Sequence, residues 1–244
     1  MLLALAGLGA LYVHALDPTL HTNAPSHLLL DRRGRYLGEV PSSNDALGYW
    51  PLPAVLPEKI AIATIETEDR HFHDHAGVHA PSIVRAVWQN LRNVRVVSGA
   101  STIAMQVARM QHPASRSLWA KAREAGEALW LIQKNGHDQV LRQYLTVAPY
   151  GNRAQGVVRA ARLYFDKPAE DLSWQQAAFL AALPQQPGRM SPWTDAGRAR
   201  ALKRSRRILQ NLRDRGVITP EYPLHGAVVA RSPSPQGVVS PGTA

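Results

Sequence analysis

The sequence predicts a mainly α-helical domain with a short β-hairpin near its start, and three observations support this prediction. Apolar residues recur at helical spacing in several segments, beginning with Ile83, Val84, Val87, Trp88 and Leu91. Ser117 and Ser173 stand where helix N-caps are expected, and the helix after Ser173 must end at Pro184. The region before Glu58 has a different character, with six prolines between residues 18 and 57.

The hairpin is expected from the apolar runs 27–30 and 35–40, which flank the turn-like tetrapeptide Asp31-Arg-Arg-Gly34. After the helices that contain Pro81 and follow Ser117, further helices are expected at 137–148, 154–165, 173–183 and 195–215. The residues after about 223 are mostly Pro, Ser, Gly and Val, which is typical of a flexible tail. We therefore expect a membrane anchor at 1–16, a β-like linker at 17–57, a helical domain at 58–222 and a tail at 223–244.

The first sixteen residues are apolar except for His14 and carry no formal charge. As a helix they would span roughly 24 Å, slightly less than the ~30 Å hydrocarbon core of a bilayer. This favours a membrane anchor. A signal peptide and a buried helix remain alternatives, although the segment lacks the basic start and the clear Ala-x-Ala site of a signal peptide.

The chain has 28 basic and 18 acidic residues, for a net charge of +10, which indicates an anionic partner. Nucleic acid is not expected, because the basic residues form neither aromatic-interleaved patches nor a known binding motif. The chain has no cysteine, which excludes disulfides and thiolate-bound metals.

Three segments have the residue types of a functional site. The first, 66–77, crowds acidic residues and histidines before Gly77, either as an active-site loop or as a solvated charged turn. Its histidines lack the spacing of a helical zinc motif, so no metal site is assigned. In the second, 98–109, the Ser101 and Thr102 hydroxyls precede an expected helix whose N-terminus favours an anion, or they simply cap that helix. The third, 116–127, places Lys121 and Arg123 beside Glu124, on a site or on a solvated helix face.

Taken together and in this order, the segments resemble the signatures of glycosyltransferase family 51, the peptidoglycan glycosyltransferases. The first signature is matched by Glu68, Asp69, Phe72, His75 and Gly77. The second is matched by Gly99, Ala100, Ser101, Thr102, Ile103, Gln106 and Arg109, and the third by Lys121, Arg123 and Glu124. Two further signatures are similar to Tyr144-Leu145 with Gly151, and to 177–184. The residues around Met105 and 148–151 are most similar to the penicillin-binding protein 1C type, and no transpeptidase domain is expected in the stretch after residue 192.

The resemblance implies a lysozyme-like helical fold with a larger lobe and a small membrane-proximal lobe. It also implies polymerisation of lipid II into a β-1,4-linked glycan, with inversion and release of undecaprenyl pyrophosphate. Glu68 and Glu124 would be the catalytic residues, with Glu68 as the base. Substrate would be bound by Asp69, Phe72, His75, Ser101, Thr102, Gln106, Arg109, Arg116, Lys121 and Arg123. Mg²⁺ or Mn²⁺ is a possible cofactor. The expected partners are lipid II, the growing glycan strand, the membrane and other cell-wall synthesis proteins, with the domain on the periplasmic side of the bacterial inner membrane.

The chain departs from the family pattern at His79, Thr146, His137 and Gln139. These departures motivate an alternative, a degenerate module that binds lipid II or scaffolds partners without catalysis. A lysozyme-like hydrolase is a second alternative, but cutting finished glycan would require neither the cations between Arg109 and Arg123 nor a membrane anchor.

Overall fold

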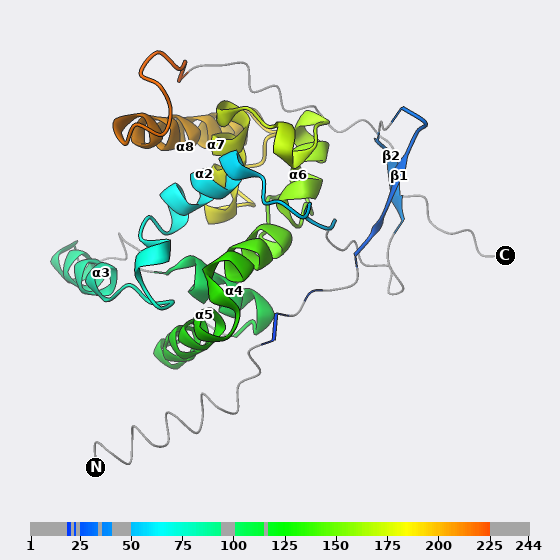
Figure 1. Ribbon diagram of the computed structural model, residues 1–244. Coiled ribbons are helices and arrows are strands. Elements are labelled where there is room, and N and C mark those ends of the chain that lie inside the picture. The colour runs from blue at the N-terminus through cyan, green and yellow to red at the C-terminus, as the bar shows by residue number, and fades with distance from the viewer. Residues whose placement is uncertain are drawn as a thin grey trace, which may run out of the picture. The chain divides into compact units, whose positions relative to one another are not determined.

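The computed structural model describes residues 19–20, 22, 25–33, 36–40, 50–93, 101–114 and 117–224. Over these residues the chain is mainly helical with one short hairpin, which confirms the predicted fold class (Figure 1). The anchor expected at 1–16 lies outside the described residues, as does nearly all of the expected tail. Among the residues that are described, no helix combines the length and the apolar character needed to cross a membrane.

The chain divides into two compact units, which are described separately below. Unit 1 contains residues 1–21 and 68–144, and unit 2 contains residues 22–67 and 145–244.

The helices of unit 1 begin where the sequence places their caps. The unit contains the 3-10 helix η1 (Phe72–Asp74), α3 (Ala80–Asn93), α4 (Ile103–Gln111) and most of α5 (Leu118–Val147). Thr102 has an extended backbone and its hydroxyl accepts a hydrogen bond from the Met105 amide at 3.1 Å, so it is the N-cap of α4. The Ser117 hydroxyl accepts from Ala120 N at 3.0 Å and begins α5 in the same way. The two helices predicted on either side of Gly136 form one long element, interrupted at that glycine by a backbone with φ +77°.

Unit 2 contains the hairpin and the remaining helices. The elements are β1 (His27–Leu30), β2 (Tyr36–Val40), α2 (Glu58–Glu68, the last residue of which belongs to unit 1), α6 (Val157–Phe165), η2 (Ala169–Asp171), α7 (Trp174–Ala182), η3 (Leu183–Gln185) and α8 (Asp195–Asp214). The two strands are antiparallel, with His27 opposite Val40, as predicted. Helix α6 begins three residues later than predicted, because Gln155 pairs with Pro149 and the N-cap Gly156 has φ +80°, outside the helical region.

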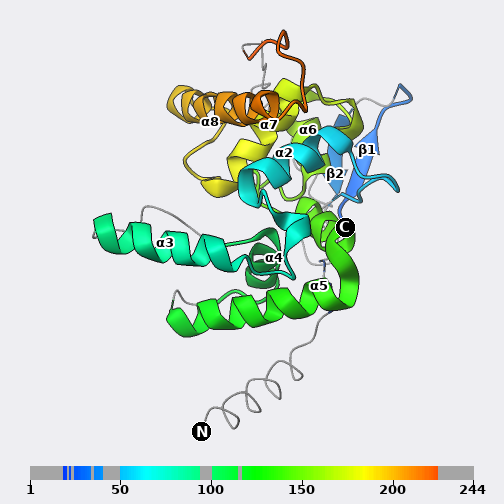
Figure 2. The same ribbon diagram turned by 60° about the vertical axis from the view of Figure 1, so that its left-hand side comes forward.

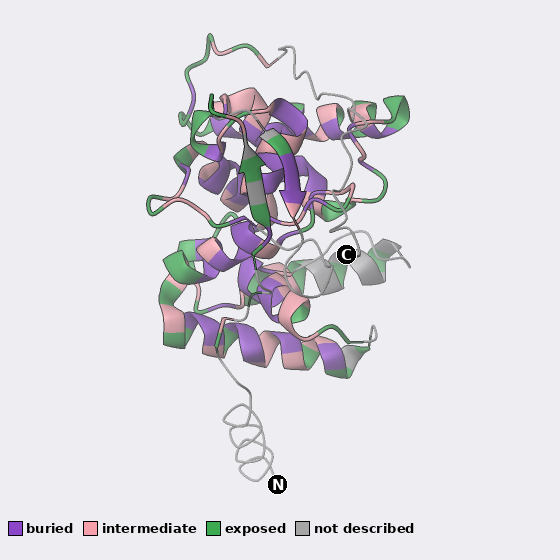
Figure 3. Ribbon diagram, turned by 90° about the vertical axis from the view of Figure 1, so that its right-hand side faces the viewer, coloured by how far each residue is buried: buried purple, intermediate pink, exposed green. Residues whose placement is uncertain are grey.

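The core of unit 2 is built on α7. Ser173 and Gln176 form the predicted capping box, and every side chain from Ala177 to Leu183 is at most 1% exposed. Small alanines let α7 approach α8 closely, and α8 contributes Ala201, Ile208, Leu209 and Leu212 to the same core (Figures 1 and 2). The outer residues of α8 are mostly charged and exposed. Figure 3 shows this division into buried and exposed residues along the helices.

Candidate active site

The loop after α2 is held by a buried pair between Asp69 and His75. The His75 Nδ1 accepts a hydrogen bond from Gly77 N at 3.0 Å, so the ring proton lies on Nε2. Nε2 therefore donates to both oxygens of the Asp69 carboxylate, at 3.0 and 3.1 Å. The two side chains are only 6% and 5% exposed. This pair fixes the segment that follows Glu68.

The same carboxylate connects the loop to α4. Asp69 Oδ2 accepts from the Ile103 amide at 3.1 Å, at the helix N-terminus where a negative charge is favourable. The Thr102 hydroxyl donates to the Gly77 carbonyl at 2.6 Å. Gly77 has φ +113°, and a Cβ there would overlap the Ala128 carbonyl of α5, so only glycine fits. Asp69, His75 and Gly77 of the first signature thus form one structural junction with Thr102 and Ile103 of the second.

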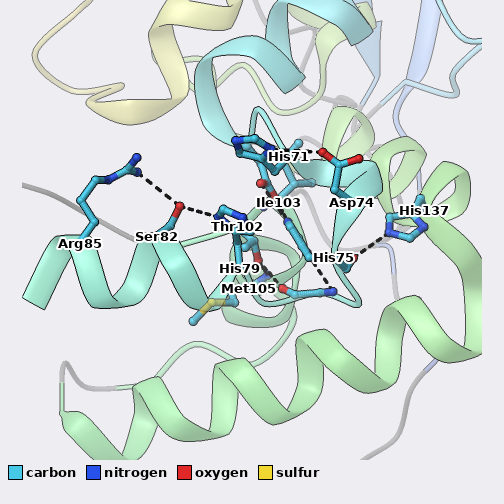
Figure 4. A network of polar contacts seen from close by, with 12 residues as sticks. His71, Asp74, His75, His79, Ser82, Arg85, Thr102, Ile103, Met105 and His137 are labelled. Atoms are coloured by element: carbon cyan, nitrogen blue, oxygen red, sulfur yellow. Dashed lines mark hydrogen bonds and ion pairs between the residues drawn. The ribbon is translucent and has the colours of Figure 1, made fainter.

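Histidines and Phe72 complete this junction, as Figure 4 shows for the labelled side chains. Phe72 is fully buried and meets the rings of His75 and His137 edge-on. His137 Nε2 donates to the His75 carbonyl at 3.0 Å. His79, which departs from the family pattern, bonds to Ser82 at 2.7 Å and stacks on His71. Phe72, Asp69, His75 and Thr102 therefore all hold the loop in this structure, through contacts within unit 1.

Glu68, the last residue of α2, lies beside α4. Its Oε2 accepts a hydrogen bond from the Gln106 side-chain amide at 2.9 Å, and the glutamate is half-buried. This hydrogen bond from the side-chain amide orients the carboxylate. The geometry is suitable for a general base, because such a group must be ionised and held in one orientation.

Glu124 lies in a different environment near the start of α4. It is buried on α5, and its Oε2 accepts from the Lys121 ammonium at 2.9 Å. The same ammonium donates to the Ser101 hydroxyl, next to the N-cap of α4. Lys121, Ser101 and Glu124 thus form a connected group with an exposed cation at its edge, since 43% of the Lys121 side chain is accessible. This arrangement can bind an anion.

The remaining predicted cations are not equivalent. Arg109 is exposed on α4, and Arg116 lies outside the described residues. Arg123 is half-buried and donates to the His112 carbonyl at 2.7 Å. Its Nε lies 3.3 Å from Glu127, a buried residue to which sequence reasoning assigned no role. The i,i+4 spacing of Arg123 and Glu127 was the available signal.

Mg²⁺ or Mn²⁺ is not placed among the described residues. No group of three His, Asp or Glu side chains among them is arranged to hold a metal ion. The buried carboxylates already have protein partners, since Asp69 bonds to His75 and Ile103, and Glu124 bonds to Lys121. No chemical step is therefore assigned to a metal.

Comparisons with known proteins agree on one family. The transglycosylase family model matches residues 34–213. Penicillin-binding protein 1C of Escherichia coli K12 is 35% identical over 205 residues, which are 83% of this chain and 26% of that protein. Penicillin-binding protein 1A of Aquifex aeolicus is 37% identical over 167 residues, 68% of this chain and 23% of the relative.

The crystal structure of penicillin-binding protein 1A from Haemophilus influenzae is similar at 20% identity and a TM-score of 0.48, over 88% of this chain and 22% of that one. The chain spans about a quarter of the length of the curated relatives that it matches. The family model covers well over half of the chain and includes both site carboxylates. The chain therefore belongs to the transglycosylase family, glycosyltransferase family 51.

Proposed function

We propose that this chain is a peptidoglycan glycosyltransferase that polymerises lipid II into β-1,4-linked glycan, with Glu68 as the base. One observation carries the proposal: Gln106 of α4 donates to Glu68, and Ser101, just before α4, accepts from the Lys121 ammonium that pairs with Glu124. Both carboxylates are thus linked to the N-terminal half of α4 and its cap, Glu68 directly and Glu124 through Lys121. Two carboxylates with different partners can serve different roles in one reaction.

In the proposed reaction, Glu68 takes the proton from the 4-hydroxyl of the acceptor sugar. The oxygen attacks the anomeric carbon of the lipid-linked donor, and the bond from that carbon to the pyrophosphate breaks. Attack from the face opposite the leaving group inverts the configuration and gives the β linkage. A glutamate carboxylate is ionised at neutral pH and can therefore accept this proton.

The leaving pyrophosphate gains negative charge as the bond breaks, and a preorganised cation is the group that stabilises it. Lys121 is suited to this role because Glu124 and Ser101 fix its ammonium while leaving part of it accessible. The exposed Arg109 follows on α4, and Arg116 would add a further cation. Glu124 then acts by orienting Lys121, which agrees with its burial.

A lipid-linked diphosphate also accounts for the general composition of the chain. The net charge of +10 favours an anionic substrate at a membrane surface. The apolar segment 1–16 would anchor the protein in the bacterial inner membrane in a single pass, with the domain on the periplasmic side. The growing glycan strand and other cell-wall synthesis proteins are the corresponding partners.

The test is polymerisation of purified lipid II by wild type and by Glu68→Gln, with the glycan products separated by gel electrophoresis. Loss of the base should lower the rate by about 10²- to 10⁴-fold. Glu58→Gln, an exposed glutamate at the start of the same helix, is the matched control and should keep full activity. Equal glycan yields from wild type and Glu68→Gln would reject the proposed mechanism. Repeating the assay with a chelator shows whether the protein cations suffice without a divalent ion.

The alternative, a module that binds lipid II without catalysis, rests on the departures from the family pattern. His79 bonds to Ser82, Thr146 is buried and Gln139 is exposed. None of these three replaces Glu68, Gln106, Lys121 or Glu124. If wild type retained lipid II on a column but formed no polymer, the alternative would be favoured.

A further inference from the structure

Glu127 has no part in the proposed reaction, yet it is buried. Only 5% of the residue is exposed, and neither carboxylate oxygen accepts a hydrogen bond from a described residue. Burying an ionised carboxylate is costly unless a cation compensates it. An uncharged side chain would avoid this cost, so the charge requires an explanation.

Two side chains lie beside Glu127, and they come from different helices; Arg123 is the compensating cation. Arg123 Nε lies 3.3 Å from Oε1, one turn earlier on α5. His112 Nδ1 lies 3.5 Å from Oε2, and His112 is the C-cap residue of α4. The carboxylate therefore joins the early part of α5 to the end of α4.

Arg123 also joins α5 to the end of α4, through the backbone carbonyl of His112. Its guanidinium donates to the His112 carbonyl at 2.7 Å, where the end of a helix leaves carbonyl groups without helical partners. Glu127 and Arg123 together hold both the ring and the carbonyl of His112. The three residues form a closed cluster, here called the α4 clamp.

The α4 clamp acts at the C-terminal end of a helix whose N-terminal half contacts the candidate site. Asp69 holds the N-terminal amide of Ile103, while Gln106 bonds to Glu68 and Ser101 bonds to Lys121. A shift of α4 along or away from α5 would move Gln106 and Ser101 relative to both carboxylates. A displacement of about 1 Å at a catalytic group is enough to reduce a rate strongly.

We propose that Glu127 is a positioning residue: through Arg123 and His112 it fixes α4, and thereby sets the orientation of Glu68 and Lys121. The proposal rests on the glycosyltransferase function proposed above. It assigns Arg123 to the clamp and away from direct contact with the pyrophosphate.

The test compares Glu127→Gln with Asp138→Asn, a control that removes an exposed acid from the same helix. Glu127→Gln keeps the shape of the side chain and removes its charge. We expect kcat for lipid II polymerisation to fall about 10-fold with KM changed less than about 2-fold, because orientation is lost and substrate contacts are kept. His112→Leu removes one partner without touching Arg123 or Glu127, and should lower kcat by about 3-fold. Asp138→Asn should match wild type.

Hydrogen exchange measured by mass spectrometry supplies a readout that does not depend on activity. In Glu127→Gln the amides of 107–112 should exchange at least about 5-fold faster than in wild type, while those of 177–183 in unit 2 stay unchanged. A wild-type kcat in Glu127→Gln would overturn the proposal. So would faster exchange throughout the chain, since that result makes Glu127 a general stabilising residue. If wild type formed no polymer, the glycosyltransferase function would fail, and the local exchange at 107–112 would still decide whether Glu127 holds α4.

Discussion

The two units bury charge in different ways. In unit 1 the buried Asp69 and Glu127 contact residues of a neighbouring segment, the buried Glu124 is linked to Ser101 through Lys121, and all of these contacts lie around α4. In unit 2 the core is the alanine-rich α7, and the buried Glu39 and Glu66 pair with Arg159 and Arg215. In unit 1 the buried charges orient neighbouring side chains. In unit 2 they hold the hairpin and α2 against helices.

This difference separates two kinds of variant. Replacing a buried charge in unit 1 should lower activity, because the neighbouring carboxylates and cations lose their orientation. Replacing a buried charge in unit 2 should lower the free energy of unfolding and leave the rate per folded molecule unchanged. The following four predictions test that separation.

The largest effect is expected for Lys121→Met, which removes the cation between Ser101 and Glu124. The polymerisation rate should fall by about 10²- to 10³-fold, because the leaving pyrophosphate loses a preorganised charge. Lys134→Met, an exposed lysine on the same helix, is the matched control. Comparable rates in the two variants would show that Lys121 is an ordinary surface charge.

Asp69→Asn should reduce both stability and activity. It removes the charge that holds His75 and the N-terminus of α4, and the free energy of unfolding should fall by about 3 kcal/mol. Chemical denaturation measures this loss. Asp74→Asn breaks an exposed pair with His71 in the same loop and should cost less than about 1 kcal/mol. If the two variants lost similar amounts of unfolding free energy, burial of the Asp69 carboxylate would not explain its contribution to stability.

Glu39→Gln in unit 2 should affect stability alone. The carboxylate pairs with Arg159 at 2.8 Å and accepts from Trp50 Nε1 at 3.2 Å, and all three residues are buried. The unfolding free energy should fall by about 2 kcal/mol because a buried arginine loses its counterion. The rate per folded molecule, measured well below the unfolding temperature, should equal that of wild type. A large drop in that rate would contradict the prediction that buried charges in unit 2 affect stability alone.

The smallest effect is expected for Tyr164→Phe. The Tyr164 hydroxyl donates to the carbonyls of Tyr150 and Gly151, and its loss should cost about 1 kcal/mol. Burial raises the pKa of Tyr164 from 10.0 to about 12. The neutral hydroxyl is thus favoured in the folded state, so its contribution is complete below pH 10 and is lost as the pH rises towards 12. Urea titrations at pH 9 and 11 should show a smaller decline for Tyr164→Phe than for wild type.

The helices and their beginnings could be read from the sequence, because caps and periodicity are local. Thr102, Ser117 and Ser173 all cap where predicted, through hydroxyls that lie within three residues of the amides they bond. The start of α6 was missed by three residues. Gly156 has φ +80° and is the N-cap of α6, a glycine signal that the prediction of a start at residue 154 did not use.

The family signatures pointed to Glu68, Gln106, Lys121 and Glu124. The spacing of residues within each signature was enough to select these four positions. The sequence could not separate side chains that contact one another across the unit from those that face solvent. Phe72 and Thr102 are buried, whereas Arg109 is exposed, although all three lie in matched signatures. Burial depends on what packs against a residue, and that partner is distant in sequence.

The sequence by itself therefore determined the helical class, the hairpin and the family, and it predicted both site carboxylates. Each of these depends on residues close together in the chain or on a fixed order of motifs. Only the tertiary structure decided that α4 carries Gln106 to Glu68 and Ser101 to Lys121, and that Arg123 turns to His112 and Glu127. Except for the Arg123–Glu127 contact within one turn of α5, those contacts join residues 11 to 38 positions apart in the sequence. The packing of the helices determines which of them form.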